Sequence, residues 1–424
     1  TNMKKLLALV CVLTLAMGLC SFAHAEETIT LRVLAGQSTT DAGIEDMIDA
    51  ALAEKYPNIK LEWECVDWGN DFQPKMQVYM QSGLPDIMIG KAQDVSTYGS
   101  LGLLADLTDK PYMDNILDAA KTGVTLDGKV MGMTFNCLYQ GVYYSRAIFE
   151  DLGLSVPKTL EELDAVIATL EENGIIPFAS HMVDTWSIGN VTMQFAVNDV
   201  FNKYPTWGDM FRAGEVSFAT SEEYKACYEY NKLIYDHTWT DETFSTEQTA
   251  CDARMVMGDV FNKYPTWGDA MKVSGSWSIQ NFLDIDENYD FGIFPFPNQT
   301  GDAKLLFEPN ITFMASAQSE YQDAIDKVFE VIATDAALQQ EIYDYTKTAP
   351  MVKGVTPTFP NPSQTDIDAY AAEGMIQDVN LGNNQLVWGG FQEENAKDIA
   401  EYLQGNITIE EALNAADARR DNSK

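Results

Sequence analysis

Two hydrophobic periods alternate along the first part of the chain, and this alternation limits the possible folds more than any other feature. Every second residue is apolar in 29–33 and again in 59–65, as in a strand with one buried face. Apolar residues recur every three or four positions in 44–52, which is typical of an amphipathic helix, and a further helix is expected at about 70–82. A short apolar strand follows at 85–89. The order strand, helix, strand, helix, strand predicts an α/β sheet with crossover helices.

Helix signals recur later in the chain. Thr159 and Glu162 form a capping box ahead of an apolar-periodic stretch, and Thr408 with Glu411 predicts a final helix in the same way. An amphipathic helical face is also expected in 321–332. The length of 424 residues is enough for two or three average domains.

The N-terminus has the features of a secretory signal peptide. A basic pair precedes an apolar run over 6–19, and the tripeptide AHA that ends at Ala25 provides a cleavage site. We therefore expect residues 1–25 to be removed and the mature protein to lie outside the cytoplasm, in a periplasm or at a cell surface. Cys20 could carry a lipid anchor, but the large Leu19 directly before it argues against this.

The charge balance excludes some classes of partner. The chain has 27 Lys and Arg against 64 Asp and Glu, a net charge of −37, which repels nucleic-acid phosphates and anionic lipids. Its 8 Trp, 19 Tyr and 20 Phe are also more aromatic mass than a disordered chain carries. An acidic, aromatic-rich globular protein is therefore expected.

Motifs for metals, redox chemistry and catalysis are absent from the sequence. Only His181 and His237 follow the signal peptide, without an H-E-x-x-H arrangement, and there is no G-x-S-x-G elbow, P-loop or C-x-x-C. We expect no cofactor and no enzymatic activity. The cysteines are equally compatible with one disulfide or with buried free thiols. The four that follow the signal peptide are Cys65, Cys137, Cys227 and Cys251.

An eleven-residue segment occurs twice. The letters DVFNKYPTWGD stand at 199–209 and again at 259–269. Two copies are too few for a solenoid, which needs at least three repeats. A recent duplication or an assembly error is the plainer interpretation, and a functional repeat is the alternative.

Several short segments occur in a family order. They are 83–87 (GLPDI), 101–107 (LGLLADL), 141–145 (GVYYS), 275–277 (GSW) and Trp388. Together with the signal peptide and the opening strand and helix, they resemble the family 1 extracellular solute-binding proteins of ABC sugar importers, the maltose-binding-protein-like family. The resemblance covers nearly the whole mature chain. The family more often has Asn where this chain has Ser145.

The resemblance also gives an interpretation of the repeat. The family usually has a continuous G-x-A-A-M-x-x-x-G-x-W stretch, which this chain regains only if Val260 is joined to Ala270. We therefore infer that about nine residues, 261–269, are inserted into a helix-to-strand connection. The insert precedes Trp277 closely and so bears on the ligand site described next.

The resemblance implies an α/β, two-lobe periplasmic-binding-protein fold of type II, with mixed sheets flanked by helices and a hinge between the lobes. The chain would cross between lobes near 137–140, 294–298 and 346–351. The expected division is a signal peptide at 1–25, an N-terminal lobe at 26–137 plus 297–346, and a C-terminal lobe at 138–296 plus 347–424.

The resemblance further implies a receptor that captures a mono- or oligosaccharide between the lobes and delivers it to an ABC permease, working as a monomer. Sugars pack an apolar face on aromatic rings and need hydrogen bonds for their hydroxyls. The candidate ligand residues are Trp277, Trp388, Trp186 and Tyr139, with Gln37, Ser38, Gln93 and Asp94 at strand ends of the first lobe. The segment 308–310 could line the first-lobe edge, and Asp86 is expected to be structural.

Two alternatives stay open from the sequence. The same fold could bind a polyamine or another small solute, because a cationic ligand suits an acidic protein. A glycoside hydrolase, which needs only two suitably spaced carboxyl groups, is the alternative from a different class.

Overall fold

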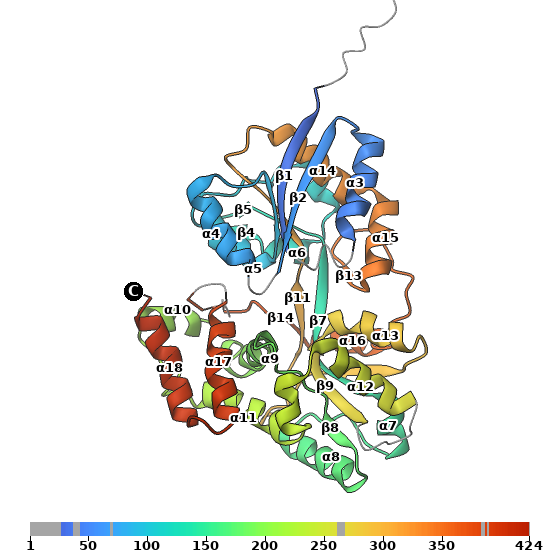
Figure 1. The fold of residues 1–424 in the computed structure, drawn as a ribbon, viewed down its shortest axis with the longest axis vertical. Helices are drawn as coiled ribbons and strands as arrows, with labels where there is room; N and C mark the ends of the chain where they lie inside the picture. Colours follow the sequence, from blue (N-terminus) through green and yellow to red (C-terminus); the bar gives the residue numbers. More distant parts are fainter. Residues whose placement is uncertain are drawn as a thin grey trace, which may run out of the picture.

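The chain forms two α/β lobes that meet at a narrow waist (Figure 1). The computed structural model describes residues 27–36, 43–67, 71–260, 268–382, 386–387 and 390–423. The expected signal peptide, with Cys20, lies outside these residues. Within them, every helix is too short or too polar to span a bilayer.

The first lobe is built on a five-stranded sheet in the order β2-β1-β3-β12-β6. β1 pairs in parallel with β2 and β3, and β12 runs antiparallel between β3 and β6. The strand and helix order predicted for residues 29–89 is confirmed. The elements of this order are β1 (Ile29–Gly36), α3 (Ile44–Lys55), β2 (Ile59–Val66), α4 (Phe72–Ser82) and β3 (Ile87–Gly90).

Later segments complete the first lobe. α14 and α15 come from far along the chain and pack on α3, which covers one side of the sheet (Figure 1). All four residues of β3 are buried, as expected for a central strand covered on both faces. The other elements are α5 (Ala92–Gly99), η1 (Pro111–Asn115), α6 (Asp118–Thr122), β4 (Thr125–Leu126), β5 (Lys129–Val130), β6 (Met133–Thr134), β12 (Thr312–Ala315), α14 (Gln322–Thr334) and α15 (Ala336–Thr346).

The second lobe is built around one long strand, β7 (Asn136–Ser145), which is buried at nearly every position. Its sheet has the order β14-β11-β7-β9-β8, and β10 and β13 also pair with β7. The other strands are β8 (Ile176–Phe178), β9 (Asp269–Gly275), β10 (Phe291–Phe294), β11 (Leu305–Pro309), β13 (Ala349–Pro350) and β14 (Ile376–Asp378).

Helices surround this second sheet in the lower half of Figure 1, with α10, α17 and α18 on the left and α7, α13 and α16 on the right. The capping boxes predicted at Thr159 and Thr408 are confirmed at the starts of α8 and α18. The helices are α7 (Arg146–Asp151), α8 (Leu160–Glu172), α9 (Trp186–Ala196), η2 (Val197–Phe201), α10 (Trp207–Ala213), α11 (Glu222–Asp236), η3 (Thr240–Ser245), α12 (Gln248–Val260), η4 (Ser276–Ser278), α13 (Ile279–Ile285), α16 (Gln364–Ala372), α17 (Phe391–Leu403) and α18 (Ile409–Asp421).

Asn136 joins the segments that cross the waist. Its carbonyl oxygen accepts from Asn310 N (3.0 Å) and its side-chain oxygen from Ile311 N (2.8 Å). Its side-chain nitrogen donates to Thr348 Oγ1 (3.1 Å), and β13 pairs with the start of β7. Segments near 136, 310 and 348 therefore meet at one buried residue.

One expected crossing is wrong. Phe294 ends β10, which pairs with β7 inside the second sheet, and Phe296 is buried in the apolar core of the same lobe. The chain stays in that sheet through β11 and enters the first sheet only at β12. The Phe-Pro alternation at 294–297 reflects core packing between strands and not a passage between lobes.

Each lobe has its own apolar core. The largest cluster of buried side chains lies wholly in the second lobe, and the next largest lies in the first lobe and its end of the waist. Separate cores allow two lobes to move as rigid bodies. Among the described residues, Cys137, Cys227 and Cys251 are buried free thiols, and Cys65 is half-buried.

Candidate functional site

A pocket lies where the two lobes meet at the waist. About 240 Å³ of space, which includes open solvent, lies there between residues of both lobes. Side chains from both lobes line the pocket. They come from α5 of the first lobe, the waist strands β7 and β11, α9, and the end of β14. The lining residues are Gln93, Gln140, Asn190, Met193, Glu308, Val379 and Asn380.

Gln140 and Glu308 form the polar floor of this pocket. In the antiparallel pairing of β7 and β11, Gln140 lies opposite Leu306, so Glu308 is two residues away on the same face of the sheet. The amide nitrogen of Gln140 donates to the Glu308 carboxylate, and Lys91 Nζ lies 3.5 Å from the other carboxylate oxygen. Both floor residues are buried. A charged hydrogen-bonding group is therefore fixed at the base of the pocket.

Several polar atoms around the pocket lack hydrogen-bond partners within the described part of the chain. They include the side-chain oxygens of Gln93 and Gln140, the amide nitrogen of Asn380 and one carboxylate oxygen of Glu393 on α17. Buried polar groups in folded proteins are nearly always paired. These atoms are available to a polar ligand.

Asp94, predicted as a ligand residue, is buried and hydrogen-bonded within the first lobe. Its Oδ2 accepts from the backbone nitrogen of Lys91 (2.8 Å), which forms the capping box at the start of α5, and its Oδ1 accepts from Gln73 Nε2 (2.7 Å). Burial raises the pKa of the Asp94 carboxyl, and these hydrogen bonds oppose the shift. The residue fixes the helix that carries Gln93 to the pocket.

Two of the predicted aromatic residues are neighbours in the second lobe. The rings of Trp186 and Trp277 meet edge to face with centroids 6.2 Å apart, and His181 packs against Trp186 at 5.4 Å. Trp277 Nε1 is buried without a partner among the described residues. The ring folds back over Gly275, where an added Cβ would lie only 2.1 Å from the indole. Any larger residue there would displace the Trp277 ring.

The structure places Tyr139 next to the site but on the other face of its strand. Because side chains alternate along β7, Tyr139 points away from the face that carries Gln140 and packs between two apolar clusters. Burial raises the pKa of its hydroxyl well above the usual range. Its backbone nitrogen donates to Ser276 Oγ (3.0 Å), which ties β7 to the turn that carries Trp277.

Three predicted residues, Gln37, Ser38 and Trp388, lie outside the described residues. The structure does bring Gln93 into the pocket, and it adds residues that sequence reasoning did not select. Gln140 lies in the middle of β7, and Asn380 comes two residues after the end of β14. Asn190 and Glu393 lie on helices and carry no sequence signal that selects them.

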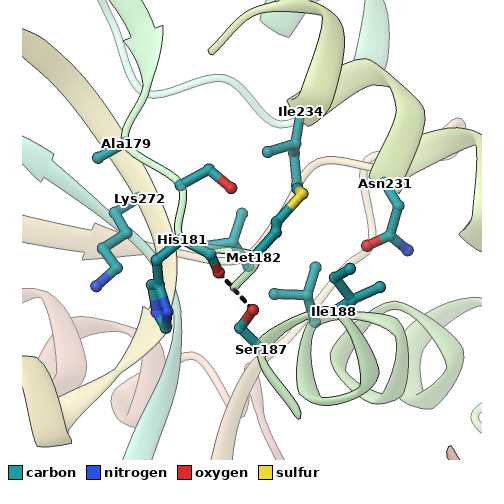
Figure 2. A pocket seen from close by; sticks show the side chains of 11 residues that line it. Ala179, His181, Met182, Ser187, Ile188, Asn231, Ile234 and Lys272 are labelled. Atoms are coloured by element: carbon teal, nitrogen blue, oxygen red, sulfur yellow. Dashed lines mark hydrogen bonds between the residues drawn. The ribbon is translucent and has the colours of Figure 1, made fainter. Parts of the chain in front are cut away.

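A second cavity lies inside the second lobe and is lined in part by His181, which packs against Trp186. Figure 2 shows His181 and Lys272 on one side and Ile188, Asn231 and Ile234, from helices, on the other. The amine of Lys272 is buried and pairs with Asp252, which also accepts from Asn281 Nδ2 (2.8 Å). Burial lowers the pKa of His181 well below its usual range, and the charge of Lys272 adds to this. The aromatic pair is thus backed by a neutral imidazole.

The described residues contain no group of three or more His, Cys, Asp or Glu arranged to hold a metal ion. The expected structural role of Asp86 is confirmed. Its carboxylate accepts from Arg32 N (2.8 Å) and Ser319 Oγ (2.6 Å) and so joins segments of the first lobe.

Comparisons with known proteins agree with this architecture. The multiple sugar-binding protein of Streptococcus mutans is 21% identical over 365 residues, covering 82% of each chain. The structure of a chitin oligosaccharide binding protein superposes with a TM-score of 0.77 at 19% identity, over 93% of this chain and 98% of that one. The structure of the solute-binding protein RafE in complex with raffinose superposes with a TM-score of 0.73 at 17% identity. The match covers 92% of this chain and 98% of that one. At these identities the solved structures show a shared fold.

A family model provides the assignment by sequence. The model described as bacterial extracellular solute-binding protein matches residues 35–339, well over half of the chain. The matched range runs through both sheets and the waist strands that line the pocket. The chain therefore belongs to the bacterial extracellular solute-binding protein family.

Proposed function

We propose that this chain is an extracytoplasmic receptor that captures a mono- or oligosaccharide between its lobes and delivers it to an ABC permease. The observation that carries the proposal is the pocket at the waist, which combines a fixed carboxylate and amides with a nearby indole pair. Relatives named for sugar binding, and structures of relatives with saccharides, support the same ligand class.

The chemistry of the pocket suits a sugar. Gln140, Glu308 and Asn380 offer hydrogen bonds to hydroxyl groups, which would lose free energy if buried without partners. Trp186 and Trp277 offer apolar ring surface for the C–H face of a pyranose. The unpaired Nε1 of Trp277 could donate to a sugar oxygen.

The proposed ligand set follows from these positions. Trp277, Trp186 and Gln93 would contact ligand, and Asp94 would act through the helix that it caps. Gln37, Ser38 and Trp388 stay proposals from the family resemblance alone. Tyr139 would support the Trp277 turn through its backbone.

Closure is the proposed signal to the permease. A ligand shifts the open–closed equilibrium only if it binds the closed form better, so it must contact both lobes. We propose lobes close to the predicted division, 26–137 plus 297–346 and 138–296 plus 347–424. Because β11 pairs with β7 in the second sheet, we place the point where the chain re-enters the first lobe at about residue 310 and not at 297.

The remaining features are also proposals. The family is one of extracellular binding proteins, so we infer a non-catalytic, monomeric receptor that is released after cleavage near Ala25. A polyamine in the same pocket is the second candidate, because carboxyl groups surround the floor residues.

The test begins with the mature protein and a thermal-shift panel of sugars, polyamines, amino acids and metal ions. A ligand present at 100 times its Kd stabilises the native state by about 2.7 kcal/mol, so even weak binding raises the Tm. A shift with saccharides supports the proposal. A shift with polyamines alone would keep the fold and replace the ligand.

Titration calorimetry of Trp277→Ala then tests the site. Loss of one stacked indole should weaken saccharide binding by about 1–3 kcal/mol. Trp63→Ala is the matched control, because Trp63 lies on β2, remote from the waist, and donates to Asp49. Equal affinities for the two variants would remove Trp277 from the site.

A further inference from the structure

Carboxyl groups outnumber amines at the pocket between the lobes. Glu308 lies at its floor, Asp378 ends β14 beside the lining residue Asn380, and Glu393 on α17 is close enough to Glu308 and Lys91 to feel both charges. Lys91 is 3.5 Å from Glu308 and is the lysine that these carboxyl groups share. Three carboxyl groups and one amine therefore lie at or beside the pocket.

Glu308 acts on both neighbouring acids, although Lys91 lies close to it. Burial raises the pKa of the Asp378 carboxyl, and the charge of Glu308 adds to the shift. Burial also raises the pKa of Glu393, where Glu308 adds to the shift although Lys91 opposes it. The negative charge of Glu308 thus still acts on both acids with Lys91 in place.

The unpaired atoms around the pocket are mostly acceptors. A carboxylate can only accept, so the amide of Gln140 must turn its nitrogen toward Glu308 and its oxygen toward the pocket. That oxygen is fully buried and has no partner in the described part of the chain, and the same holds for oxygens of Gln93 and Glu393. Among the fully buried side-chain atoms of the described pocket-lining residues, the Asn380 nitrogen is the one donor without a partner.

We propose that the ligand of this pocket is a saccharide that carries a protonated amine, bound with its ammonium group between the Glu308 carboxylate and the Gln140 side-chain oxygen. This inference rests on the proposed function and narrows its substrate class. An ammonium group has three donors and no acceptor, which matches an acceptor-rich site, whereas a hydroxyl group offers one donor. Its hydrogen bonds to a carboxylate and an amide oxygen are charge-assisted, which makes them stronger than neutral ones. The hydroxyls of the same ligand can pair with Asn380 and the indole nitrogen.

The test compares disaccharides that share one β-1,4-linked skeleton and differ only at C2. Cellobiose carries hydroxyls, N,N′-diacetylchitobiose carries amides, and its fully deacetylated form carries amines. Calorimetry of the mature protein at about pH 6 should give a Kd for the deacetylated sugar at least about tenfold lower than for the other two. The preference should shrink in high salt and at about pH 9, where such an amine loses its charge.

Two variants should move this preference in opposite directions. Glu308→Gln keeps the shape of the floor and should abolish the preference for the amine, whereas Lys91→Met should increase it. Glu172→Gln, at the exposed end of α8, removes the same charge away from the pocket and should behave as the parent chain.

Each outcome distinguishes the inference from the function on which it rests. If either neutral disaccharide binds as tightly as the deacetylated sugar or more tightly, the proposal of an amine-bearing ligand is wrong. Binding of raffinose or stachyose with no affinity for the deacetylated sugar would contradict it in the same way. Failure of every saccharide, charged or neutral, would overturn the receptor proposal itself. Binding of putrescine, with no binding of the sugars, would show that the cationic ligand of the pocket is a polyamine and not a saccharide.

Discussion

The two copies of the eleven-residue repeat are identical in sequence, yet their final aspartates have opposite surroundings. Asp209 lies on α10 with a side chain that is 74% exposed and forms an ion pair with Arg212 one turn along the helix. Asp269 begins β9, is fully buried, and has no hydrogen-bond partner for either oxygen in the described part of the chain. The difference shows that the surrounding fold, and not the local sequence, decides how an aspartate affects the stability of the chain.

The first copy fits its place in the core. Trp207 stacks on Phe211 with centroids 5.2 Å apart and contacts Phe201 edge to face. Asp199, at the start of this copy, accepts from the Tyr230 hydroxyl (2.7 Å) and from Asn298 Nδ2 (3.0 Å). The segment therefore supplies both apolar and polar contacts that the second lobe needs.

The second copy, 259–269, begins in the last two residues of α12, which ends at Val260, and finishes at Asp269, the first residue of β9. Residues 261–267 lie outside the described residues. Burial raises the pKa of Asp269 well above its usual range, and Arg254 opposes the shift. A buried carboxyl group at this junction, without a partner among the described residues, agrees with an insertion of residues 261–269 into a fold that was already established.

The largest effect in this comparison should come from the first copy. Trp207→Ala removes an indole packed among buried rings and should lower the free energy of unfolding by about 3–5 kcal/mol. Urea denaturation measures this. The same substitution at position 267 is the matched control, and an equal loss there would make both copies integral to the fold.

Deletion of residues 261–269 tests the insertion directly. The shortened chain regains the uninterrupted family stretch and loses the buried Asp269, so we expect its Tm to be unchanged or higher. Calorimetry, together with saccharide affinity, measures the outcome. Collapse of the fold would show that the segment is needed where it stands.

A smaller gain is expected from Asp269→Ala. Removing a buried polar group without a partner should stabilise the chain by about 1–3 kcal/mol at neutral pH. The folded pKa is raised, so below the unfolded value of about 4 both states are protonated and the charge has no effect. As pH rises above that value, the unfolded state ionises first and the parent chain loses stability. The Tm advantage of the variant should therefore grow from about pH 4 to neutral, and a constant advantage would exclude ionisation of Asp269 as its cause.

The smallest effect should come from Asp209→Ala. Its exposed pair with Arg212 contributes at most about 1 kcal/mol, and this contribution is screened by salt. Denaturation at low and high salt measures it. If Asp209→Ala lowers the free energy of unfolding by as much as Asp269→Ala raises it, the difference in solvent exposure does not explain the different effects of the two aspartates.

The same dependence on context explains what the sequence could predict. The strands and helices over 29–89 and the capping boxes of α8 and α18 depend on neighbours within a few residues, so periodicity and caps identified them. Ile87–Gly90 is short and buried throughout, and flanking polar residues still marked its ends.

The pocket depends on contacts that no local pattern contains. Gln140 and Glu308 are 168 residues apart and meet only through the register of β7 on β11. Asp94 follows a strand, as a ligand residue of this fold could, but its capping hydrogen bond occupies it. Trp277 was selected because its position matches an aromatic platform of the resembled family, and Trp186 was added as a further candidate on the second lobe. Their mutual contact adds support without testing their role.

The hydrogen bonds of Asn136 have a mechanical consequence. Because one buried amide joins the segments that cross the waist, sliding these segments past one another would break several hydrogen bonds at once. A single side chain therefore sets the relative register of the connections between the lobes.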